Sequence, residues 1–547
     1  MRGMPTCADT VARVLKDAGV RRIFGLPGGE ILDFMEAARR AGIDFLLTRQ
    51  ESTAAFMADV TGQISGTPGV CVATLGPGAV NMTLGVANAY LDRSPVIAIT
   101  ASHARQAGPY ATHQNLDLNA VYRPFTKMAI TLDGHDTAAK VSRAIDASLA
   151  PRRGPVHIAI PSDLARTDAG DDGTRPALDT RCASGAVASL EELAAALGAA
   201  RRPVAILGLD LDPRLHTEAV RTFVERLDLP VFVTPKAKGI FPEDHRLFFG
   251  VCAGVSGDGC IVDFLATADL LLGIGFDPVE SDKLWHHTMP LVSVSPVSIA
   301  AASFRPRVEA TGDLVEILNG LRERVQPSFD WRPDDRRAFR AGLEAVLRPA
   351  APPRGLSGYE LTRQLRHRFP RETVFTTDVG SVKMITSQAW TAYDPLTFFE
   401  SNGLSAMSYA LPAAMAARLQ FPDRPVLCTI GDGGFGMTLA EIETCVRERL
   451  HFVTVVFNDN GLSLIDAAQQ RRGFAVNGVR YGSVDFAAAA RAMGAWGRRV
   501  STMAELEAAL DEATAVDLPV VIDAVVDPAE YAAQTAAPTS AQPGRPA

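Results

Sequence analysis

The stretch Val426-Leu427-Cys428-Thr429-Ile430-Gly431-Asp432-Gly433-Gly434-Phe435-Gly436 decides the fold class of this sequence. Val426–Ile430 is a continuous apolar run of strand length, a glycine turn follows it, and a helical stretch continues through Leu439–Arg449. A buried strand that passes through a tight turn into a helix is the repeating unit of a parallel α/β sheet. The glycines let the backbone approach an anion closely, and the helix start favours negative charge, so the turn predicts a phosphate site.

The carboxylate of Asp432 distinguishes this turn from an ordinary dinucleotide site. The turn also matches the G-x-G-x-x-G of a Rossmann fold, so a nicotinamide dehydrogenase is the first alternative. A carboxylate there would repel a pyrophosphate unless a divalent cation lies between them. The next expected strand ends in Asn458-Asp459-Asn460-Gly461, and neighbouring parallel strands would bring the two loops together. We therefore expect Asp432 and Asp459 to bind magnesium, while a plain turn and a solvated polar loop would explain either half alone.

Apolar runs of strand length alternate with longer helical stretches along the whole sequence, which predicts an α/β protein with parallel sheets. The expected strands are Val20–Gly25, Gly69–Thr74, Val96–Thr100, Val156–Ile160, Val204–Leu207, Leu270–Ile274, Val374–Thr376, Val426–Ile430, Phe452–Phe457 and Val520–Val525. They form three clusters, separated by polar or Pro/Arg-rich stretches at 167–185 and 348–355. We therefore expect three doubly wound parallel-sheet domains at 1–170, 185–345 and 355–533, followed by a flexible tail at 534–547.

The composition argues against several classes of protein. Hydrophobic residues make up 47% and charged residues 21%, which is typical of a folded protein and not of a disordered one. The net charge of −8 and the lack of a dense Lys/Arg run argue against nucleic acid as a partner. With no long apolar run and no signal-peptide core, we expect a cytoplasmic protein without a membrane partner. Seven cysteines without C-x-x-C spacing predict reduced thiols, and ten histidines without H-E-x-x-H give no support to a zinc hydrolase.

The G-D-G and N-D-N motifs together resemble the metal-binding signature of thiamine diphosphate enzymes. The resemblance implies that Asp432, Asp459 and a backbone carbonyl, that of Gly461, hold Mg²⁺ on the cofactor diphosphate. The family often has asparagine at the position of Asp459, and aspartate is an equally good oxygen ligand. The resemblance further implies contacts with the cofactor from Gly431, Gly433 and Gly434.

Thiamine catalysis needs a carboxyl group on N1′ of the aminopyrimidine, and Glu51 is the candidate. The strand end Phe45–Thr48 is followed by Arg49-Gln50-Glu51 and a helical stretch. A carboxyl group buried there would suit proton shuttling. In isolation, Glu51 would more simply complement a helix N-terminus. The segment nevertheless resembles the R-H-E of acetolactate synthase-like enzymes, with Gln50 in place of histidine, and this implies that Glu51 activates the cofactor.

Four other segments resemble cofactor-binding segments of the same family. They are Phe24–Gly29, Thr74–Gly78 with Asn81, Thr377–Ser381 and Gly403–Pro412. The resemblance implies cofactor contacts from Pro27, Gly28, Gly76, Asn81, Gly380, Ser381 and Met407. Met407 would be the apolar wedge that bends the cofactor into a V, although a methionine in an apolar stretch is otherwise core filler. Val382 stands where the family commonly has histidine, and Lys383 follows it, which leaves the substrate preference open.

Thr112–Asp117 and Thr126-Lys127 resemble the H-Q-x-x-D and T-K segments of catabolic, flavin-independent acetolactate synthases. The resemblance implies that Gln114 contacts the reacting intermediate and that His113, Lys127 and Gln469 contact the substrate; an ordinary polar loop would explain His113 and Gln114 in isolation. Gly275–Glu280 resembles the G-Y-D-P-x-E of the same enzymes, so FAD is not expected. The resemblance extends to carboxyethylarginine synthase and covers approximately residues 5 to 530.

The resemblance implies a carboligase that decarboxylates a 2-oxo acid, pyruvate by default, and adds the resulting enamine to an acceptor. A second pyruvate as acceptor would give acetolactate. The first alternative is a 2-oxo-acid decarboxylase, or a carboligase with a different acceptor in specialised biosynthesis. The second is a non-catalytic cofactor-binding regulatory protein, for which Glu51 and Met407 would not be required. The resemblance also implies a homodimer or homotetramer with active sites at the subunit interface.

Overall fold

The computed structural model describes residues 5–107, 110–169, 187–280, 290–301, 304–348 and 353–531. These residues form three parallel sheets of six strands each, which confirms the α/β class and the three doubly wound sheets expected from the sequence. The expected tail at 534–547 and most of the two expected linkers lie outside the described residues, so the domain limits stay predictions. Among the described helices, none has the length and apolar character to cross a membrane.

The chain divides into two compact units that do not follow the order of the sequence. The first unit contains Met1–Arg181 and two later segments, Gly403–Pro422 and Thr438–Leu450. The second unit contains Cys182–Asn402, Asp423–Met437 and His451–Ala547. The first unit, which contains the N-terminal sheet, therefore also includes helices from the last third of the sequence.

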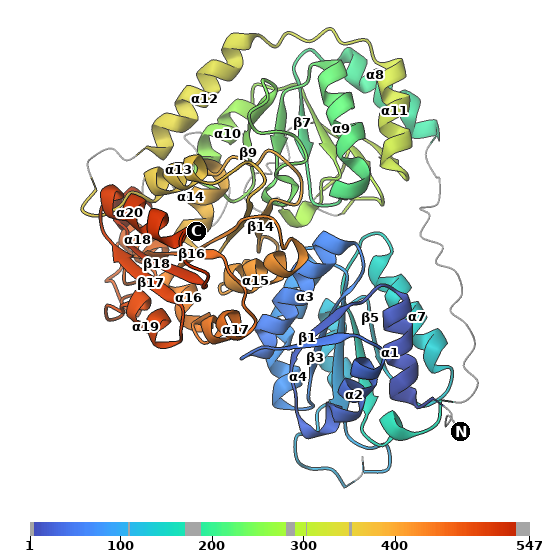
Figure 1. Ribbon diagram of the computed structural model, residues 1–547. Coiled ribbons are helices and arrows are strands. Elements are labelled where there is room, and N and C mark those ends of the chain that lie inside the picture. Colours follow the sequence, from blue (N-terminus) through green and yellow to red (C-terminus); the bar gives the residue numbers. More distant parts are fainter. Residues whose placement is uncertain are drawn as a thin grey trace. The chain divides into compact units, whose positions relative to one another are not determined.

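The sheet of the first unit has the strand order β2-β1-β3-β4-β6-β5. Its strands are β1 (Arg22–Leu26), β2 (Asp44–Leu47), β3 (Gly69–Ala73), β4 (Val96–Ser102), β5 (Met128–Thr131) and β6 (Val156–Pro161). One face packs against α1 (Cys7–Asp17), α2 (Leu32–Arg40) and α7 (Thr137–Leu149), and the other carries α3 (Glu51–Ser65), α4 (Pro77–Asn81) and α5 (Thr83–Leu91), as Figure 1 shows. The short helix α6 (Leu118–Tyr122) precedes β5.

Helix α3 is buried on almost every side, because α5 and α15 (Ala410–Gln420) both pack on it. The rings of Phe56 on α3 and Tyr409 at the start of α15 meet edge to face at 5.5 Å. A helix that is buried on nearly every side needs such partners, so α15 is part of the core of this unit.

The second unit contains the central and the C-terminal sheets. The central sheet has the order β12-β11-β10-β7-β8-β9, and the C-terminal sheet has the order β14-β13-β15-β16-β18-β17. The central strands are β7 (Pro203–Leu207), β8 (Val231–Val233), β9 (Phe248–Val251), β10 (Leu270–Ile274), β11 (Leu291–Ser295) and β12 (Val308–Thr311). The C-terminal strands are β13 (Val374–Thr377), β14 (Phe398–Glu400), β15 (Val426–Gly431), β16 (Val453–Asn458), β17 (Trp496–Val500) and β18 (Val520–Val525).

Helices cover both faces of these two sheets. Those of the central region are α8 (Val187–Ala199), α9 (Pro213–Leu227), α10 (Asp258–Leu265), α11 (Leu314–Arg324) and α12 (Pro333–Leu347). Those of the C-terminal region are α13 (Gly358–Arg368), α14 (Ser381–Ala389), α16 (Asp432–Thr438), α18 (Ser463–Arg471), α19 (Phe486–Ala492) and α20 (Met503–Ala513). The expected helix after the glycine turn was wrong in its bounds: α16 begins inside the turn, and α17 (Glu441–Arg447) starts after a break at Leu439-Ala440.

Candidate cofactor and metal site

Asp432 and the loop that carries Asp459 come together at the carboxyl ends of two paired strands. β15 and β16 run in parallel with Gly431 opposite Phe457, so the loops that follow them lie at the same edge of the sheet. Asp432 Oδ1 accepts hydrogen bonds from the backbone N–H of Gly433 at 2.7 Å and from a tyrosine hydroxyl at 2.9 Å. The strand register thus produces the meeting of loops that the sequence predicts.

The two carboxyl groups retain oxygen atoms that no described residue satisfies. Asp432 Oδ2 and Asp459 Oδ1 are buried without a hydrogen-bond partner, and so is Asn460 Oδ1 in the same loop. Burial raises the pKa of Asp432, and burial together with the charge of Asp432 raises the pKa of Asp459 to about 7. Unsatisfied oxygens on two carboxylates that repel each other fit a divalent cation, whose charge would reverse that repulsion.

The oxygen atoms of Asp432 and Asp459 fit a magnesium site that the cofactor would complete, and they do not fit a site built from protein side chains alone. Within the described residues there is no group of three or more His, Cys, Asp or Glu side chains that could hold a metal. A cation at Asp432 and Asp459 would therefore need carbonyl and ligand oxygens to complete its shell. Magnesium is commonly bound in this way, through one or two carboxylates plus substrate phosphates.

Three hydroxyl groups beside the aspartates were not expected from the sequence. Tyr481 donates to Asp432, whereas Ser463 and Tyr531 hydrogen bond to Asp459. These bonds favour the ionised carboxylates and oppose part of the effect of burial. Ser463 follows Asp459 by four positions, whereas Tyr481 and Tyr531 come from segments further along the chain that no local sequence pattern marks.

Gly461 and Gln469 shape the loop that carries Tyr481. Gly461 pairs with the backbone of this loop, and a Cβ on Gly461 would lie 2.9 Å from the carbonyl oxygen of Val479. The Gln469 side chain donates to the carbonyl oxygen of Asn477 and accepts from its N–H, both at 3.0 Å. The amide of Gln469, expected to contact substrate, thus holds a turn of the loop in this structure.

The second glycine turn of the C-terminal sheet lies at the end of β13, which pairs with β15. Gly380 caps α14 with φ +120°, a conformation that side chains rarely allow, and a Cβ there would meet nothing within 4 Å. Ser381 is the first residue of α14, while Gly433 and Gly434 lie in the first turn of α16. Val382, where the family commonly has histidine, is buried in the apolar core.

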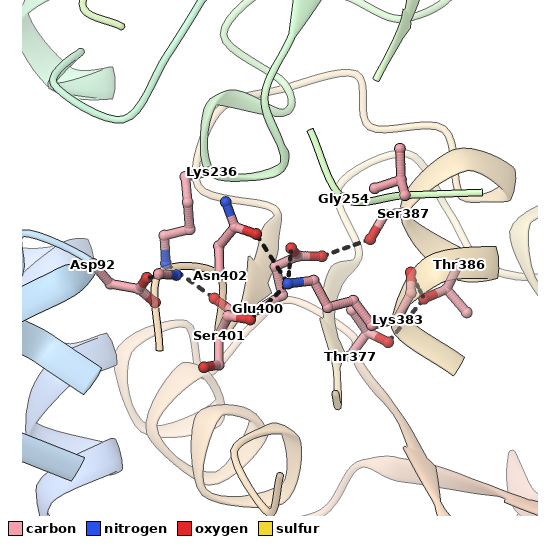
Figure 2. Close-up of polar contacts among 12 residues, drawn as sticks. Asp92, Lys236, Gly254, Thr377, Lys383, Thr386, Ser387, Glu400, Ser401 and Asn402 are labelled. Carbon is pink, nitrogen blue, oxygen red and sulfur yellow. Dashed lines mark hydrogen bonds and ion pairs between the residues drawn. The ribbon is translucent and has the colours of Figure 1, made fainter. Parts of the chain in front are cut away.

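The ammonium group of Lys383 points into a polar cluster in the protein interior (Figure 2). Its Nζ donates to the carbonyl oxygen of Ser401 and to Asn402 Oδ1, both at 2.9 Å, and it pairs with Glu400 Oε1 at 3.2 Å. Glu400 is fully buried and accepts from Ser387 Oγ at 2.5 Å. Because three acceptors occupy the amine of Lys383, its role in this structure is to fix the end of β14.

Glu51 is the first residue of α3 and is only 7% exposed. Its Oε2 accepts a hydrogen bond of 2.5 Å from Nδ2 of Asn81, the last residue of α4. A Cβ on Gly78 in the same short helix would lie 3.1 Å from Glu51 Oε1, so α4 lies directly against the carboxyl group. The structure therefore brings together two residues that the sequence placed in separate segments.

The glycines of the neighbouring turns make close contacts within the first unit. A Cβ on Gly28 would lie 2.5 Å from Thr74 Oγ1, and one on Gly76, where φ is +60°, would lie 2.7 Å from Gln114 Cβ. Gln114 is thus brought onto the Gly76 turn. Pro27, next to Gly28, is exposed.

His113 and Lys127, the two expected substrate residues of this region, have different surroundings. His113 is exposed, next to Gln114 in the sequence. Lys127 donates from Nζ to the carbonyl oxygens of Ala150 and Arg152, both at 2.7 Å. These bonds tie the amine of Lys127 to the segment after α7.

Met407 lies in a strained turn just before α15. Ser405 and Ser408, on either side of it, have left-handed backbone conformations with φ of 54° and 74°. Such conformations cost a non-glycine residue of order 1–3 kcal/mol and cluster at functional sites. Since α15 packs on α3, Met407 and Glu51 belong to elements of the same unit.

The switch point of the central sheet, where a doubly wound sheet usually binds a nucleotide, lies between the ends of β7 and β10. The backbone N–H groups after β7 are all engaged there: Gly208 with Ile274 O at 3.1 Å, Leu209 with Glu280 Oε2 at 2.7 Å, and Asp210 with Gly275 O at 2.8 Å. A Cβ on Gly208 would lie 2.5 Å from Phe276 Cα. The turn 275–280 therefore packs closely on the backbone after β7 and supplies acceptors for two of these N–H groups.

Comparison with protein families gives three matches along the chain. Residues 5–121 match the thiamine pyrophosphate enzyme N-terminal TPP binding domain. Residues 190–321 match the central domain of the same enzymes, and residues 378–524 match their C-terminal TPP binding domain. Each match covers one of the three parallel sheets in whole or in large part.

Curated relatives are similar over nearly the whole chain. The acetolactate synthase of Bacillus subtilis is 29% identical over 534 residues, which cover 95% of this chain and 93% of the relative. The probable 2-ketoarginine decarboxylase AruI of Pseudomonas aeruginosa is 30% identical over 520 residues, with coverages of 92% and 90%. The large subunit of acetolactate synthase isozyme 1 of Escherichia coli is 31% identical over 490 residues, with coverages of 87% and 85%.

Proposed function

The chain belongs to the thiamine diphosphate-dependent, acetolactate synthase-like enzymes, and from this premise we propose that it is a Mg²⁺-dependent carboligase. It would decarboxylate a 2-oxo acid, pyruvate by default, and join the remaining fragment to an acceptor. The observation that carries this proposal is the pair Asp432 and Asp459, each of which has one buried oxygen without a hydrogen-bond partner among the described residues. Thiamine diphosphate, when bound, would supply a nucleophilic carbon for the 2-oxo acid and an electron sink for the loss of carbon dioxide.

The C-terminal sheet would hold the diphosphate end of the cofactor. Asp432, Asp459 and the carbonyl oxygen of Gly461 would bind Mg²⁺, and the metal would neutralise the diphosphate oxygens. Backbone N–H groups at the starts of α14 and α16 would face the same anion. The residues assigned to this end are Gly380, Ser381, Gly431, Gly433 and Gly434.

Glu51 would hold and release the proton on N1′ of the aminopyrimidine. Its burial and its bond to Asn81 support this role, because they limit the access of water and hold the carboxyl group through Oε2. The turns at Pro27, Gly28 and Gly76 would line the pyrimidine, and Met407 would bend the cofactor. Gln114, which lies on the Gly76 turn, would contact the reacting substrate.

A second candidate, a decarboxylase or a carboligase with a different acceptor, is favoured by two observations. A relative named as a probable 2-ketoarginine decarboxylase is as similar to this chain as the acetolactate synthases are. The position where the family commonly has histidine is Val382, which is buried and offers no polar group to an acceptor. His113, Lys127 and Gln469 stay the proposed substrate contacts for either reaction.

We propose that the enzyme works without FAD. The N–H groups of Gly208, Leu209 and Asp210 support this, because each already has an acceptor within the protein and is not free for a nucleotide phosphate. We further propose a homodimer or homotetramer with active sites at the subunit interface, as the family resemblance implies. Sedimentation of the active enzyme as a monomer would contradict the proposed assembly.

Product analysis tests the reaction. The enzyme is incubated with pyruvate, thiamine diphosphate and Mg²⁺, and the products are identified by mass spectrometry. Acetolactate is the expected product, whereas acetaldehyde alone would favour the decarboxylase. If neither forms, a panel of 2-oxo acids and aldehydes is used to find the donor and acceptor.

Glu51→Gln separates an enzyme from a cofactor-binding regulatory protein. The variant should still bind thiamine diphosphate with Mg²⁺ in calorimetry, because the metal ligands are intact. Exchange of the cofactor C2 proton with solvent should fall by a factor of about 10² to 10⁴, which is the usual contribution of a positioned acid or base. Unchanged exchange would refute the role of Glu51.

A further inference from the structure

Glu441 is a buried carboxylate that neither the sequence patterns nor the proposed chemistry uses. It is the first residue of α17, is 1% exposed, and belongs to the first unit together with α3. Burial raises the pKa of its carboxyl group. A buried carboxylate is costly unless hydrogen bonds repay its lost hydration, so its partners show what it does.

The partners of Glu441 are the backbone N–H groups just before Glu51. Oε1 accepts from Arg49 N at 3.0 Å and from Gln50 N at 3.2 Å, and Oε2 accepts from Arg49 N at 3.2 Å. Thr444, one turn further along α17, donates to Oε2 at 2.7 Å and so orients the carboxylate. Most of the hydrogen bonds that Glu441 accepts therefore come from a segment about 390 positions away in the sequence.

Helix α3 lacks a local side-chain cap, and Glu441 instead accepts from the N–H of the N-cap residue Gln50 and from that of Arg49 just before it. Its N-cap residue, Gln50, makes no side-chain capping hydrogen bond. The N–H groups at a helix start need acceptors and carry partial positive charge, so a carboxylate there both pairs and stabilises them. A second contact from α17 reaches the same segment, because the Arg447 guanidinium donates to the carbonyl oxygen of Leu47 at 2.7 Å.

We propose that Glu441 is a positioning residue for Glu51. It holds the two peptide groups that precede the peptide of Glu51, those of Arg49 and Gln50, and Asn81 then fixes the far end of the Glu51 side chain. A carboxyl group that must reach N1′ of the cofactor has little tolerance, since a displacement of about 1 Å can cost about 100-fold in rate. This inference rests on the proposed role of Glu51.

The test compares Glu441→Gln and Glu441→Ala with a matched control, Glu344→Gln, on α12. Glu344 forms an exposed ion pair with Arg348 in the second unit and has no part in the contacts described above. In the cofactor-free protein, amide hydrogen exchange at Arg49 and Gln50 should become faster in both Glu441 variants and stay unchanged in the control. Wild-type protection of these amides in Glu441→Ala would overturn the proposal.

With cofactor, exchange of the C2 proton should slow by about 10- to 100-fold in Glu441→Gln. Binding of thiamine diphosphate and Mg²⁺ in calorimetry should change little, because the metal ligands are untouched. A purely structural role would instead lower the melting temperature and leave the C2 exchange rate of the folded fraction unchanged. Glu441→Asp, which keeps the charge, gives the same comparison if the alanine variant does not fold.

A double-variant cycle separates failure of this inference from failure of the proposed function. If Glu441 acts through Glu51, adding Glu441→Gln to Glu51→Gln should slow C2 exchange no further. Additive losses would mean that Glu441 acts by another route, and the proposal would be wrong. Wild-type C2 exchange in Glu51→Gln alone would instead refute the proposed function.

Discussion

Two buried pairs of charged groups at the carboxyl ends of strands in the C-terminal sheet behave in opposite ways. Asp432 and Asp459 carry like charges and retain unsatisfied oxygens. Lys383 and Glu400 carry opposite charges, and Ser387, Ser401 and Asn402 satisfy much of their remaining hydrogen-bonding capacity. Glu400 Oε1 also lacks a hydrogen-bond partner among the described residues, but the Lys383 ammonium lies 3.2 Å from it, whereas Asp459 faces the like charge of Asp432. The difference teaches that a buried charge signals a ligand when no opposite charge satisfies it; a pair satisfied by its own counter-charge is part of the scaffold.

The largest expected effect comes from breaking the satisfied pair. Lys383→Met leaves Glu400 buried without its cation, so the free energy of unfolding should fall by about 3–5 kcal/mol. Urea denaturation followed by circular dichroism measures it. Arg368→Met is the control, because the Arg368–Asp511 pair is exposed and should contribute at most about 1 kcal/mol. If the free energy of unfolding fell equally in Lys383→Met and Arg368→Met, the buried Lys383–Glu400 pair would be no more important for stability than an exposed pair.

Substitutions of Asp432 and Asp459 should change the affinity of the protein for thiamine diphosphate with Mg²⁺. Asp432→Asn should weaken calorimetric binding of thiamine diphosphate with Mg²⁺ by more than about 100-fold, because a direct ligand matters more than an outer-shell group. Asp459→Asn should retain binding to within about tenfold, since an amide oxygen can replace the carboxylate oxygen. Both changes should stabilise the metal-free protein, because each removes one of two repelling charges. A metal-free protein destabilised by both would contradict this interpretation.

The smallest expected effect concerns the pH dependence of stability and comes from His157. This residue is a third kind of buried group, one without an ion-pair partner among the described residues. It stacks on Tyr122 at 4.0 Å and shares a hydrogen bond with Thr100, and burial lowers its pKa to about 3. Because the folded pKa lies below the unfolded value, this contribution to stability is present above about pH 6.5 and is lost as the pH falls toward 3.

Between pH 7 and pH 5 the loss should be about 2 kcal/mol in the free energy of unfolding. It is obtained by comparing denaturation of the protein with that of His157→Gln at both pH values. Replacing the exposed His135 with glutamine is the control. A pH dependence that His157→Gln leaves intact would show that other groups cause it.

The ten strands expected from the sequence all have neighbours on both sides, but two other interior strands, β8 and β11, were not expected. All ten expected strands lie inside the three sheets, where burial on both faces produces a continuous apolar run. The edge strands β5, β14 and β17 gave no such signal, because they are short or carry polar residues on an exposed face. The periodicity of the sequence thus identifies the interior of each sheet better than its limits.

The residues of the candidate site also fall into two groups, those that neighbouring sequence predicts and those that only the fold reveals. Asp432 and Asp459 follow apolar strands directly, and Glu51 precedes a helix, so their types and positions can be predicted from neighbours in the sequence. Glu441 and Tyr481 cannot, because their partners come from other elements and only the fold brings them together. The substrate contacts assigned from resemblance stay predictions.

The assembly of the first unit from three separated segments bears on how the chain is made. While a ribosome synthesises the N-terminal third, α3 has neither α15 to cover its apolar side nor Glu441 to cap its start. The nascent domain must therefore wait for more than half of the remaining chain before its core closes, a period in which apolar surface is open to aggregation. A fragment that ends near residue 180 should accordingly be a poor substitute for the intact N-terminal domain in recombinant work.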